Sequence, residues 1–591
     1  MKEKSCYVRK TKIICTIGPA TDTEEKIHAL IQNGMNVARL NFSHGTYEYH
    51  GERIDIIRKV AREMRVPVAI LLDTKGPEIR IKSFADKKVE LKQGDTFTLA
   101  LGDEPGDAKR VCITYEKLYQ DVTKGTQILV DDGLICLSVE QVEGTDIICK
   151  VINGGMLSNN KSINVPDVHL DFEYISEKDK NDILFGIQKD VDFIAASFCR
   201  SAYDVLEVRK LLEKNGGKEI DIIAKIENGS GVDNIDEILK VADGVMVARG
   251  DMGVEIDIVE LPRIQKMIIK KSYSAGKKVI TATQMLDSMI KNPRPTRAEA
   301  TDVANAVYDG TSAIMLSGET AVGEYPIEAL TTMSRIAEKT EKNINYKKRF
   351  AELEPDFAVS VTSAISRATC STADNLGAAA IITFTYSGRT ARTVSSFRPD
   401  VLQIACTSNP KTYNQLSLSW GVLSVMAEDA SDTDGLFEQA VEKALETGYV
   451  RHGDVVVITA GVPVGISGST NILKVQVVGN VLVKGEGINH IAVSGKVCVC
   501  RSEEEAVQSF ENGDILVIPK TSNNIMNILK EASAIITEQK GIYSHAAIVG
   551  LTREIPVICG AENACSIIAN GTTVTVDGTR GIVYAGVIKA L

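Results

Sequence analysis

The sequence predicts an α/β protein whose largest part is a (β/α)8 barrel. Three observations predict it: short apolar runs alternate with helical patterns, eight such runs occur, and polar residues follow most of them. The clearest example is 221–251, where two apolar runs flank a segment with apolar residues at helical spacing. Because active sites of such barrels lie at the carboxyl ends of the strands, this stretch is expected to carry chemistry.

The eight expected barrel strands fall in two groups, three before residue 76 and five after residue 169. They are 12–17, 37–41, 68–72, 193–197, 222–226, 244–248, 278–283 and 313–317. Expected helices include 23–33, 49–64 and 232–241. Polar residues at or just past seven strand ends favour a shared site over ordinary loop polarity; these are Arg39, Asp73, Ser197, Lys225, Asp251, Thr283 and Ser317.

The rest of the chain is expected to form three further domains. Residues 76–169 contain short alternating segments and many turn residues, which indicates an inserted all-β domain between two barrel segments, 1–75 and 170–344. Residues 345–474 are expected to form an open, largely parallel α/β sheet with strands at 379–383, 401–406, 422–426 and 454–459. Residues 475–591, rich in Val, Ile and Gly, form a last segment.

Composition excludes several classes of protein. A chain of 591 residues is too long for one hydrophobic core, and its net charge of −11 argues against a general nucleic-acid binder. The amino terminus lacks a secretory pattern, and no apolar run reaches a membrane span. The 12 cysteines show no disulfide pattern, and Cys498 and Cys500 form a lone C-x-C, so we expect reduced thiols in a cytoplasmic protein.

Glu227 and Asp251 are candidate ligands of a divalent cation. They follow neighbouring expected strands, and paired carboxylates suit Mg²⁺, which keeps water and substrate oxygens in its shell. The alternative is two surface carboxylates, or ion-pair partners of Lys225 and Arg249. Lys225 lies two residues before Glu227, so both side chains share a face of the strand. An ammonium there can stabilise an oxyanion or a phosphoryl group in flight.

Further candidates surround this pair. Gly250 begins a turn whose free N–H groups suit an anion, and Thr283 can add a hydroxyl. Arg39 and Arg80 suit phosphate, although a lone Arg is more often a surface residue. Four oxygen-bearing residues with one net negative charge suit a monovalent cation better than Mg²⁺; they are Asn41, Ser43, Asp73 and Thr74.

Seven motifs stand out along the chain: KIICTIGPA, GMNVARLNFSHG, LLDTKGPEIR, AKIEN, ARGDMGVE, TATQMLDSM and PRPTRAEATDVANAVYDGTSAIMLSGETAVGEYP. Through them, about residues 9–474 resemble the bacterial pyruvate kinases. The resemblance implies phosphoryl transfer from phosphoenolpyruvate to ADP, which yields pyruvate and ATP as the last step of glycolysis. It also implies a homotetramer.

The resemblance implies roles for the matched residues. Lys225 would stabilise the transferring phosphoryl group and the enolate, with Arg39 and Thr283 as further catalytic residues. Glu227 and Asp251 would hold Mg²⁺ or Mn²⁺. The remaining roles are as follows: Arg39, Gly250, Asp251 and Thr283 bind the substrate, Asn41, Ser43, Asp73 and Thr74 hold K⁺, and Arg80, Lys161, Asn41 and His44 bind the nucleotide.

Two further expectations come from the same resemblance. Glu78 resembles the K⁺-dependent members of the family, so we predict K⁺ dependence. The inserted domain is placed to act as a lid that excludes water.

A strand-to-helix junction in the third domain suits a phosphate, because it combines hydroxyls, a Gly and free N–H groups. Its residues, called the effector loop below, are Thr383, Thr385, Ser387, Gly388, Arg389 and Thr390. The alternative is simple helix capping. The resemblance implies an allosteric site for a phosphorylated effector; fructose bisphosphate, a sugar monophosphate and AMP remain open.

The last segment resembles the phosphohistidine domain of phosphoenolpyruvate-utilising enzymes through KGIYSHAAIVGLTREIPVICGAENA and NGTTVTVDGTRGIVY. His545 falls on the phosphorylated histidine, but Tyr543 stands where that family has Thr. No nucleotide-binding domain able to charge the histidine is visible. We therefore expect a retained fold with a structural role.

Two other functions are compatible with parts of this pattern. A metal-dependent aldolase or lyase would use a similar barrel site, but the inserted domain with Arg80 and Lys161 favours the kinase. A non-catalytic regulator is disfavoured because Lys225, Glu227 and Asp251 are all intact.

Overall fold

The computed structural model describes residues 8–166, 168, 173–352, 360–429, 432–462, 470–479 and 481–588. The chain divides into two compact units, each treated by itself below. The first contains Met1–Ser360, Tyr386–Pro399 and Thr407–Ser424, and the second contains Val361–Thr385, Asp400–Cys406 and Val425–Leu591.

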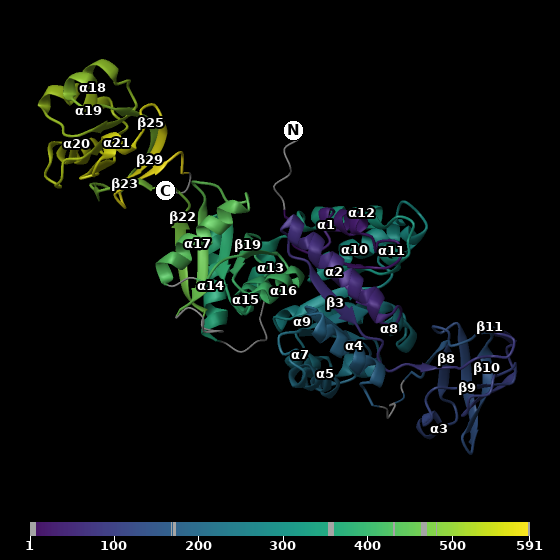
Figure 1. Cartoon of the computed structure of the whole chain (residues 1–591). Coiled ribbons are helices and arrows are strands. Elements are labelled where there is room, and N and C mark those ends of the chain that lie inside the picture. Colours follow the sequence, from purple (N-terminus) through teal and green to yellow (C-terminus); the bar gives the residue numbers. More distant parts are fainter. Residues whose placement is uncertain are drawn as a thin grey trace. The chain divides into compact units, whose positions relative to one another are not determined.

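The first unit contains a closed barrel of eight strands in the order β1-β17-β16-β15-β14-β13-β3-β2, as predicted. Figure 1 draws the barrel segments in purple to teal. Neighbouring strands are parallel, for example β14 with β15 and β2 with β3. The strands are β1 Lys12–Thr16, β2 Val37–Asn41, β3 Ala69–Asp73, β13 Phe193–Ala196, β14 Asp221–Ile226, β15 Gly244–Ala248, β16 Lys278–Ala282 and β17 Ala313–Leu316.

The barrel strands read as continuous apolar runs because both of their faces are buried. Successive side chains alternate between the barrel interior and the surrounding helices. Phe193, Ile223, Met246 and Ile280 pack inside the barrel. Their sequence neighbours, such as Ile222, pack against the helices. Burial on both sides makes the barrel a rigid frame for groups at its rim.

One expected helix is interrupted. The pattern at 232–241 predicted a single helix, but the structure has α6 (Gly229–Asp233) and α7 (Ile235–Val241). Asn234 lies at the break and donates through Nδ2 to the carbonyl of Arg200 at 2.9 Å. Asn readily exchanges helical bonds for such contacts, which explains the interruption.

The other helices of the barrel part follow the expected alternation with strands. They are α1 Glu24–Gln32, α2 Tyr47–Met64, α4 Glu177–Gln188, α5 Ala202–Lys214, α8 Arg249–Glu255, α9 Leu261–Ser274, η1 Asp287–Ile290, α10 Arg297–Asp309, α11 Gly318–Ala321, α12 Pro326–Glu341 and α13 Tyr346–Glu352.

The inserted segment is almost entirely β, as predicted. It holds a seven-stranded sheet of order β4-β12-β8-β9-β10-β6-β7 and a two-stranded sheet, β11-β5, with one short helix, α3 (Leu118–Asp121). The strands are β4 Ile79–Arg80, β5 Lys88–Leu91, β6 Thr96–Ala100, β7 Arg110–Cys112, β8 Gln127–Val130, β9 Ile135–Glu143, β10 Asp146–Asn153, β11 Gly155–Ser158 and β12 Ser162–Asn164.

The next sheet has the order β20-β19-β18-β21-β22. β18 is parallel to β19 and β21, and β22 runs antiparallel through residue 474, where the third domain was expected to end. In chain order, this part of the sequence contains α14 Val361–Asn375, β18 Ala380–Phe384, α15 Arg389–Ser396, β19 Leu402–Thr407, α16 Pro410–Gln415, η2 Leu416–Leu418, β20 Val422–Met426, α17 Thr433–Glu446, β21 Val455–Gly461 and β22 Thr470–Val477. Of these, α15, α16 and η2 belong to the first unit.

The last sheet has eight strands in the order β23-β30-β29-β25-β26-β27-β28-β24, four of them parallel neighbours. Its elements are β23 Val481–Lys484, β24 Glu486–Gly487, β25 Ala492–Val499, α18 Glu503–Ser509, β26 Ile515–Ile518, η3 Asn523–Ile525, α19 Met526–Glu531, β27 Ala534–Thr537, α20 His545–Arg553, β28 Val557–Cys559, α21 Ala564–Ile567, β29 Thr573–Asp577 and β30 Ile582–Ala585.

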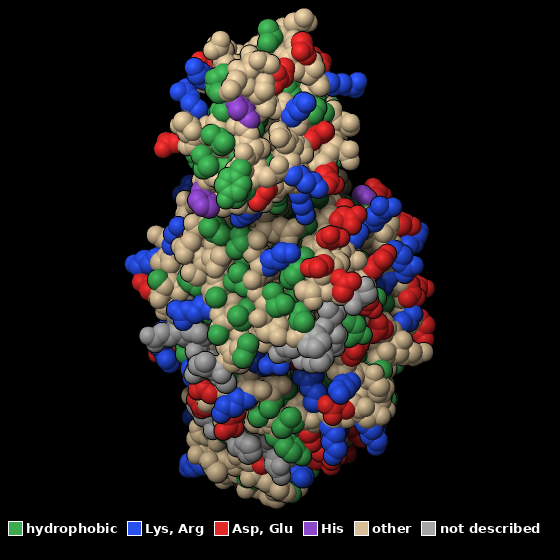
Figure 2. Space-filling view, turned by 90° about the vertical axis from the view of Figure 1, so that its left-hand side faces the viewer, with side chains coloured by type: hydrophobic (Ala, Val, Ile, Leu, Met, Phe, Trp, Pro, Cys, Tyr) green, Lys and Arg blue, Asp and Glu red, His purple; other side chains and the backbone are tan. Residues whose placement is uncertain are grey.

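The surface carries both signs of charge. On the face shown in Figure 2, Lys and Arg side chains are mixed with Asp and Glu side chains. Within the described ranges, no helix combines the length and apolar character needed to cross a membrane.

Candidate active site

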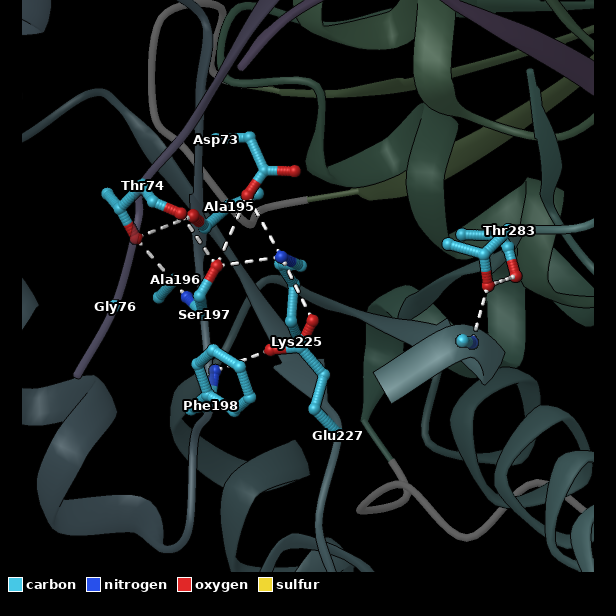
Figure 3. Close-up of polar contacts among 12 residues, drawn as sticks. Asp73, Thr74, Gly76, Ala195, Ala196, Ser197, Phe198, Lys225, Glu227 and Thr283 are labelled. Atoms are coloured by element: carbon cyan, nitrogen blue, oxygen red, sulfur yellow. Dashed lines mark hydrogen bonds and ion pairs between the residues drawn. The ribbon is translucent and has the colours of Figure 1, made fainter. Parts of the chain in front are cut away.

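The candidate site is built at the carboxyl ends of barrel strands β14, β3 and β13. Lys225 is the fifth residue of β14, Asp73 ends β3, and Ser197 directly follows β13. Because β13 pairs with both β3 and β14, these ends are adjacent. Figure 3 shows their side chains converging.

Lys225 is the centre of this cluster. Its Nζ lies 3.1 Å from Asp73 Oδ1 and 3.0 Å from Glu227 Oε1, and it donates a hydrogen bond to Ser197 Oγ at 2.7 Å. The side chain is nine-tenths buried. The ammonium is therefore held in place by three oxygens (Figure 3).

Glu227 is fully buried and only partly satisfied. Its Oε2 accepts a hydrogen bond from the backbone N–H of Phe198 at 2.6 Å. Its Oε1 makes no hydrogen bond, since the contact with Lys225 has ion-pair distance without hydrogen-bond angles. A buried carboxylate oxygen without a hydrogen bond fits a metal ligand, because the ion would compensate it.

The electrostatics of the cluster favour an additional cation. Burial raises the pKa of Glu227 to about 7; Lys225 opposes this and the Asp251 charge reinforces it. Burial alone would lower the pKa of Lys225, but Asp73 and Glu227 outweigh it and raise that pKa. The positive charge of Lys225 is thus compensated mainly by Asp73, while Glu227 has the carboxylate of Asp251 near it. A divalent cation between Glu227 and Asp251 would supply the missing positive charge.

Asp73 also binds Arg39. Arg39 Nε lies 2.6 Å from Asp73 Oδ2, and its Nη1 donates to Thr16 Oγ1 at 3.0 Å. Burial would raise the pKa of Asp73, but Arg39 and Lys225 outweigh it and lower that pKa. Asp73 therefore lies between Arg39 and Lys225 and contacts each of them through one of its two carboxylate oxygens.

The four expected ligands of a monovalent cation lie around the ends of β2 and β3. Asn41 and Asp73 are paired neighbours in the two strands. Asn41 Oδ1 accepts from the N–H of Ser43 at 3.1 Å, and Thr74 Oγ1 donates to the carbonyl of Ala195 at 3.2 Å. Their oxygens, with one carboxylate among them, fit a weakly charged cation. His44, on the same turn, is exposed.

Gly250 and Asp251 occupy the first turn of α8, directly after β15. The N–H of Gly250 donates to Thr283 Oγ1 at 2.8 Å, so this amide is engaged, whereas the sequence suggested a free one. Thr283 follows β16 with φ at 67°, and Gln284 has φ at 52°. The hydroxyl of Thr283 thus links the start of α8 to the turn after β16 through its hydrogen bond with Gly250.

Arg249 supports that strained turn. Its guanidinium donates to the carbonyl of Thr283 at 2.6 Å and forms an ion pair with Asp302 at 2.6 Å. The alternative in which Arg249 neutralises Asp251 is therefore not the observed pairing. Left-handed backbone at two non-glycine residues costs free energy, which these buried hydrogen bonds offset.

Arg80 lies in β4, and Lys161 directly precedes β12, which pairs with β4. Arg80 donates through Nε to Glu78 Oε2 at 2.8 Å and through Nη1 to the carbonyl of Asn160 at 2.6 Å. Lys161 forms an ion pair with Asp131 at 2.8 Å. The two cations therefore emerge from adjacent segments of one sheet.

The effector loop crosses the boundary between the two units, so its halves are described separately. In one unit, Thr383 is fully buried within β18, and its hydroxyl has no hydrogen-bond partner. In the other, Gly388 is the N-cap residue of α15 with φ at 75°, and as a glycine it makes no side-chain cap. The left-handed backbone at this position explains why the sequence has glycine there.

His545 begins α20 in the last sheet domain. Its Nδ1 lies 3.0 Å from Thr521 Oγ1 and its Nε2 lies 3.0 Å from Asn523 Oδ1. Tyr543, two residues earlier, is 86% exposed. Both ring nitrogens of His545 are therefore engaged within the domain.

Two positioning residues were not assigned from the sequence. Ser197 was noted as a polar strand end, but its contact with Lys225 depends on pairing between strands far apart in sequence. Phe198 has φ at 54°, which directs its N–H toward Glu227. No sequence signal marks it, because aromatic residues rarely adopt this conformation.

The chain is similar to known proteins over most of its length. Residues 8–330 match the family described as pyruvate kinase, barrel domain, residues 363–476 match pyruvate kinase, alpha/beta domain, and residues 510–581 match PEP-utilising enzyme, mobile domain. A pyruvate kinase of Geobacillus stearothermophilus is 51% identical over 98% of this chain and 99% of its own. One of Bacillus licheniformis is also 51% identical, over the same shares. One of Clostridium acetobutylicum is 54% identical over 80% of this chain and 100% of its own.

Proposed function

The chain belongs to the pyruvate kinase family, and from that premise we propose that Lys225, Glu227 and Asp251 form the centre at which phosphoenolpyruvate passes its phosphoryl group to ADP. The observation that carries this proposal is the placement of Lys225 between two buried carboxylates at the barrel rim. Phosphoryl transfer requires little covalent chemistry from the protein, so positioned positive charge is the main contribution.

The residues at the rim divide this work. Mg²⁺ or Mn²⁺, held by Glu227 and Asp251, would neutralise developing oxyanion charge when bound. Lys225 points its ammonium at the transferring phosphoryl group and at the enolate oxygen. Its three oxygen contacts fix that direction before substrate arrives, so no reorganisation is needed during reaction.

Substrate and nucleotide are assigned to two groups of residues. Arg39, Gly250, Asp251 and Thr283 bind phosphoenolpyruvate. Arg80, Lys161, Asn41 and His44 bind ADP, and the inserted domain acts as a lid that keeps water from the phosphoryl group. The pairing of β4 with β12 supports joint action of Arg80 and Lys161. The family resemblance further supports a homotetramer located in the cytoplasm.

K⁺ is proposed as a second cation, held by Asn41, Ser43, Asp73 and Thr74. We predict that replacing K⁺ with tetramethylammonium removes most of the activity. We also predict that Glu78→Lys restores activity in its absence, because an ammonium there supplies the missing charge. Initial rates against phosphoenolpyruvate in the two salts measure this. Equal rates of the wild type in both salts would contradict the prediction, and Glu177→Lys, at an exposed carboxylate, is the matched control.

The effector loop is proposed to bind a phosphorylated effector. The exposed side chain of Arg389, at the start of α15, supports this because a guanidinium can bind a phosphate through two hydrogen bonds. We predict that a sugar monophosphate, fructose bisphosphate or AMP lowers the phosphoenolpyruvate concentration needed for half-maximal rate. Arg389→Gln should weaken that response without changing the effector-free rate. If none of these compounds shifts the wild-type curve, the regulatory proposal is wrong.

The last segment is proposed to have a structural role. The Clostridium relative matches over its whole length while spanning 80% of this chain, so a pyruvate kinase need not contain a counterpart of every part of it. Asn523 Oδ1 accepts the proton of His545 Nε2, which places Thr521 as donor to Nδ1. Neither nitrogen is then free to attack a phosphoryl group.

We therefore predict no acid-labile phosphate on His545 after incubation with phosphoenolpyruvate. Mass spectrometry under alkaline conditions measures this, with His545→Asn as the blank. A modified His545 peptide above that blank would show that the domain carries phosphate.

A further inference from the structure

A small cavity in the first compact unit lies away from the carboxyl rim and has an excess of positive charge. It has a volume of about 30 Å³. Its lining includes Lys277, Lys278, Arg392 and Arg398, with Ser419 and one carboxylate, Asp243. Lys278 begins β16, and Lys277 directly precedes it, so the cavity adjoins the amino ends of the barrel strands.

The carboxylates near the cavity are already engaged. Asp243 Oδ2 lies 2.5 Å from Arg209 Nη2 and accepts from the N–H of Ile222 at 2.8 Å. Asp221 Oδ2 accepts from Lys278 Nζ at 2.8 Å. Five basic side chains, with Arg209 included, thus face two carboxylates, which leaves a local excess of positive charge.

Three buried donors around the cavity lack hydrogen-bond partners. They are Nε of Arg398, Nη1 of Arg392 and the hydroxyl of Ser419. Arg392 Nη1 lies 3.8 Å from Asp221 Oδ2, too far for a hydrogen bond. Arg398 and Ser419 are each 3% exposed. Leaving such donors unpaired is costly, and the cost is greatest for a charged group.

Arg398 is the strongest of these signals. Its Nη2 donates to the carbonyl of Gly310 at 3.0 Å and to Ser312 Oγ at 3.1 Å, and its guanidinium lies 4.8 Å from the ring centroid of Trp420. Among the residues that the structure describes, no carboxylate lies in ion-pair contact with it. Burial lowers its pKa, and the charge of Arg349 adds to this. A buried guanidinium without a counter-charge is expected to recruit one.

We propose that this cavity binds a small inorganic anion of the size of chloride, held by Arg392, Arg398 and Ser419. The volume admits one or two water-sized groups, which excludes a nucleotide or a sugar phosphate. The two guanidinium groups attract an anion and would repel a cation, and the hydroxyl of Ser419 can donate to the anion. The bound anion would compensate the excess charge beneath the barrel.

The anion would also tie two functional segments together. Arg392 lies on α15 and donates through Nη2 to the carbonyl of Ser387 in the effector loop at 2.7 Å. Its other nitrogen approaches Asp221, which begins the strand that carries Lys225. Binding or loss of the anion would therefore change the electrostatic interaction between Arg392 on α15 and Asp221 on β14.

The test uses the full chain with potassium chloride exchanged for potassium gluconate at constant K⁺ and ionic strength. We expect the unfolding midpoint of the wild type to rise with chloride and to saturate, as for binding to the folded state alone. Arg398→Gln should need at least about tenfold more chloride than the wild type for half of the maximal rise in unfolding midpoint, because the substitution removes charged hydrogen-bond donors. Lys270→Gln removes one exposed positive charge in α9 and should respond as the wild type does.

Crystals grown with bromide provide a second measurement that needs no variant. We expect an anomalous difference peak inside the cavity of the wild type. Ser419→Ala should fold and show a weaker chloride response, and Lys225→Met should keep the full response while being inactive. A cavity that holds only water in bromide, or a response in Arg398→Gln and Ser419→Ala equal to that of the wild type, would overturn the proposal.

Discussion

Lys225→Met is expected to lower kcat with phosphoenolpyruvate and ADP by about 10²–10³-fold or more. A positioned donor to a developing oxyanion contributes about this much in other enzymes. Methionine has a similar length and no charge, so the loss would report the ammonium. Because the ammonium acts mainly on the transition state, KM should change far less than kcat. Steady-state rates measured through ATP formation test this.

The control must separate chemistry from stability, since Lys225→Met leaves Asp73 and Glu227 buried without their counter-charge. Lys278→Met is well matched: Lys278 is buried in β16 and pairs with Asp221, but it lies at the amino end of its strand. We expect this variant to lower the unfolding midpoint and to keep kcat near that of the wild type. A near-normal kcat for Lys225→Met would reject the proposed role.

Glu227→Gln is expected to raise the Mg²⁺ concentration needed for half-maximal rate by at least about 100-fold. Loss of an outer-shell partner alone costs about 10–100-fold in metal affinity, and loss of a charged ligand should cost more. Glutamine keeps an oxygen that can accept from the N–H of Phe198, so the turn after β13 should stay in place. Rates over a Mg²⁺ titration, and direct Mn²⁺ binding by magnetic resonance, measure the effect.

Glu341→Gln is the matched control for this experiment. Glu341 is also buried, but it accepts from the N–H groups of Lys10 and Thr11, just before the first barrel strand. We expect lower stability and an unchanged Mg²⁺ dependence. If Glu227→Gln needs no more Mg²⁺ than Glu341→Gln does, Glu227 is not a metal ligand.

The barrel could be predicted because local patterns and global packing agree in it. The eight strands are buried on both faces, so each appears as an apolar run, and turn residues mark where each ends. The same periodicity placed Lys225 and Glu227 on one face of one strand, and the contact between them follows. The resemblance to a known family supplied the roles, which periodicity alone does not provide.

The contacts that tune the site could not be predicted in this way. Ser197 reaches Lys225 through strand pairing between residues 28 positions apart, and Arg249 holds the turn at Thr283 across 34 positions. Phe198 and Thr283 adopt left-handed backbone conformations that their residue types disfavour. Such conformations exist only because the surrounding fold compensates their cost.

By itself, the sequence determined the alternation of strands and helices, the strand ends that bear charge and the inserted β segment, because these depend on neighbours along the chain. Only the tertiary structure decided which carboxylate compensates the charge of Lys225 and which oxygen of Glu227 has no hydrogen bond. It also decided that Arg398 is buried with no carboxylate of the described residues in ion-pair contact. The reason is physical: the electrostatic energy of a buried group depends on distance and solvent access, and both are set by residues that are remote in sequence.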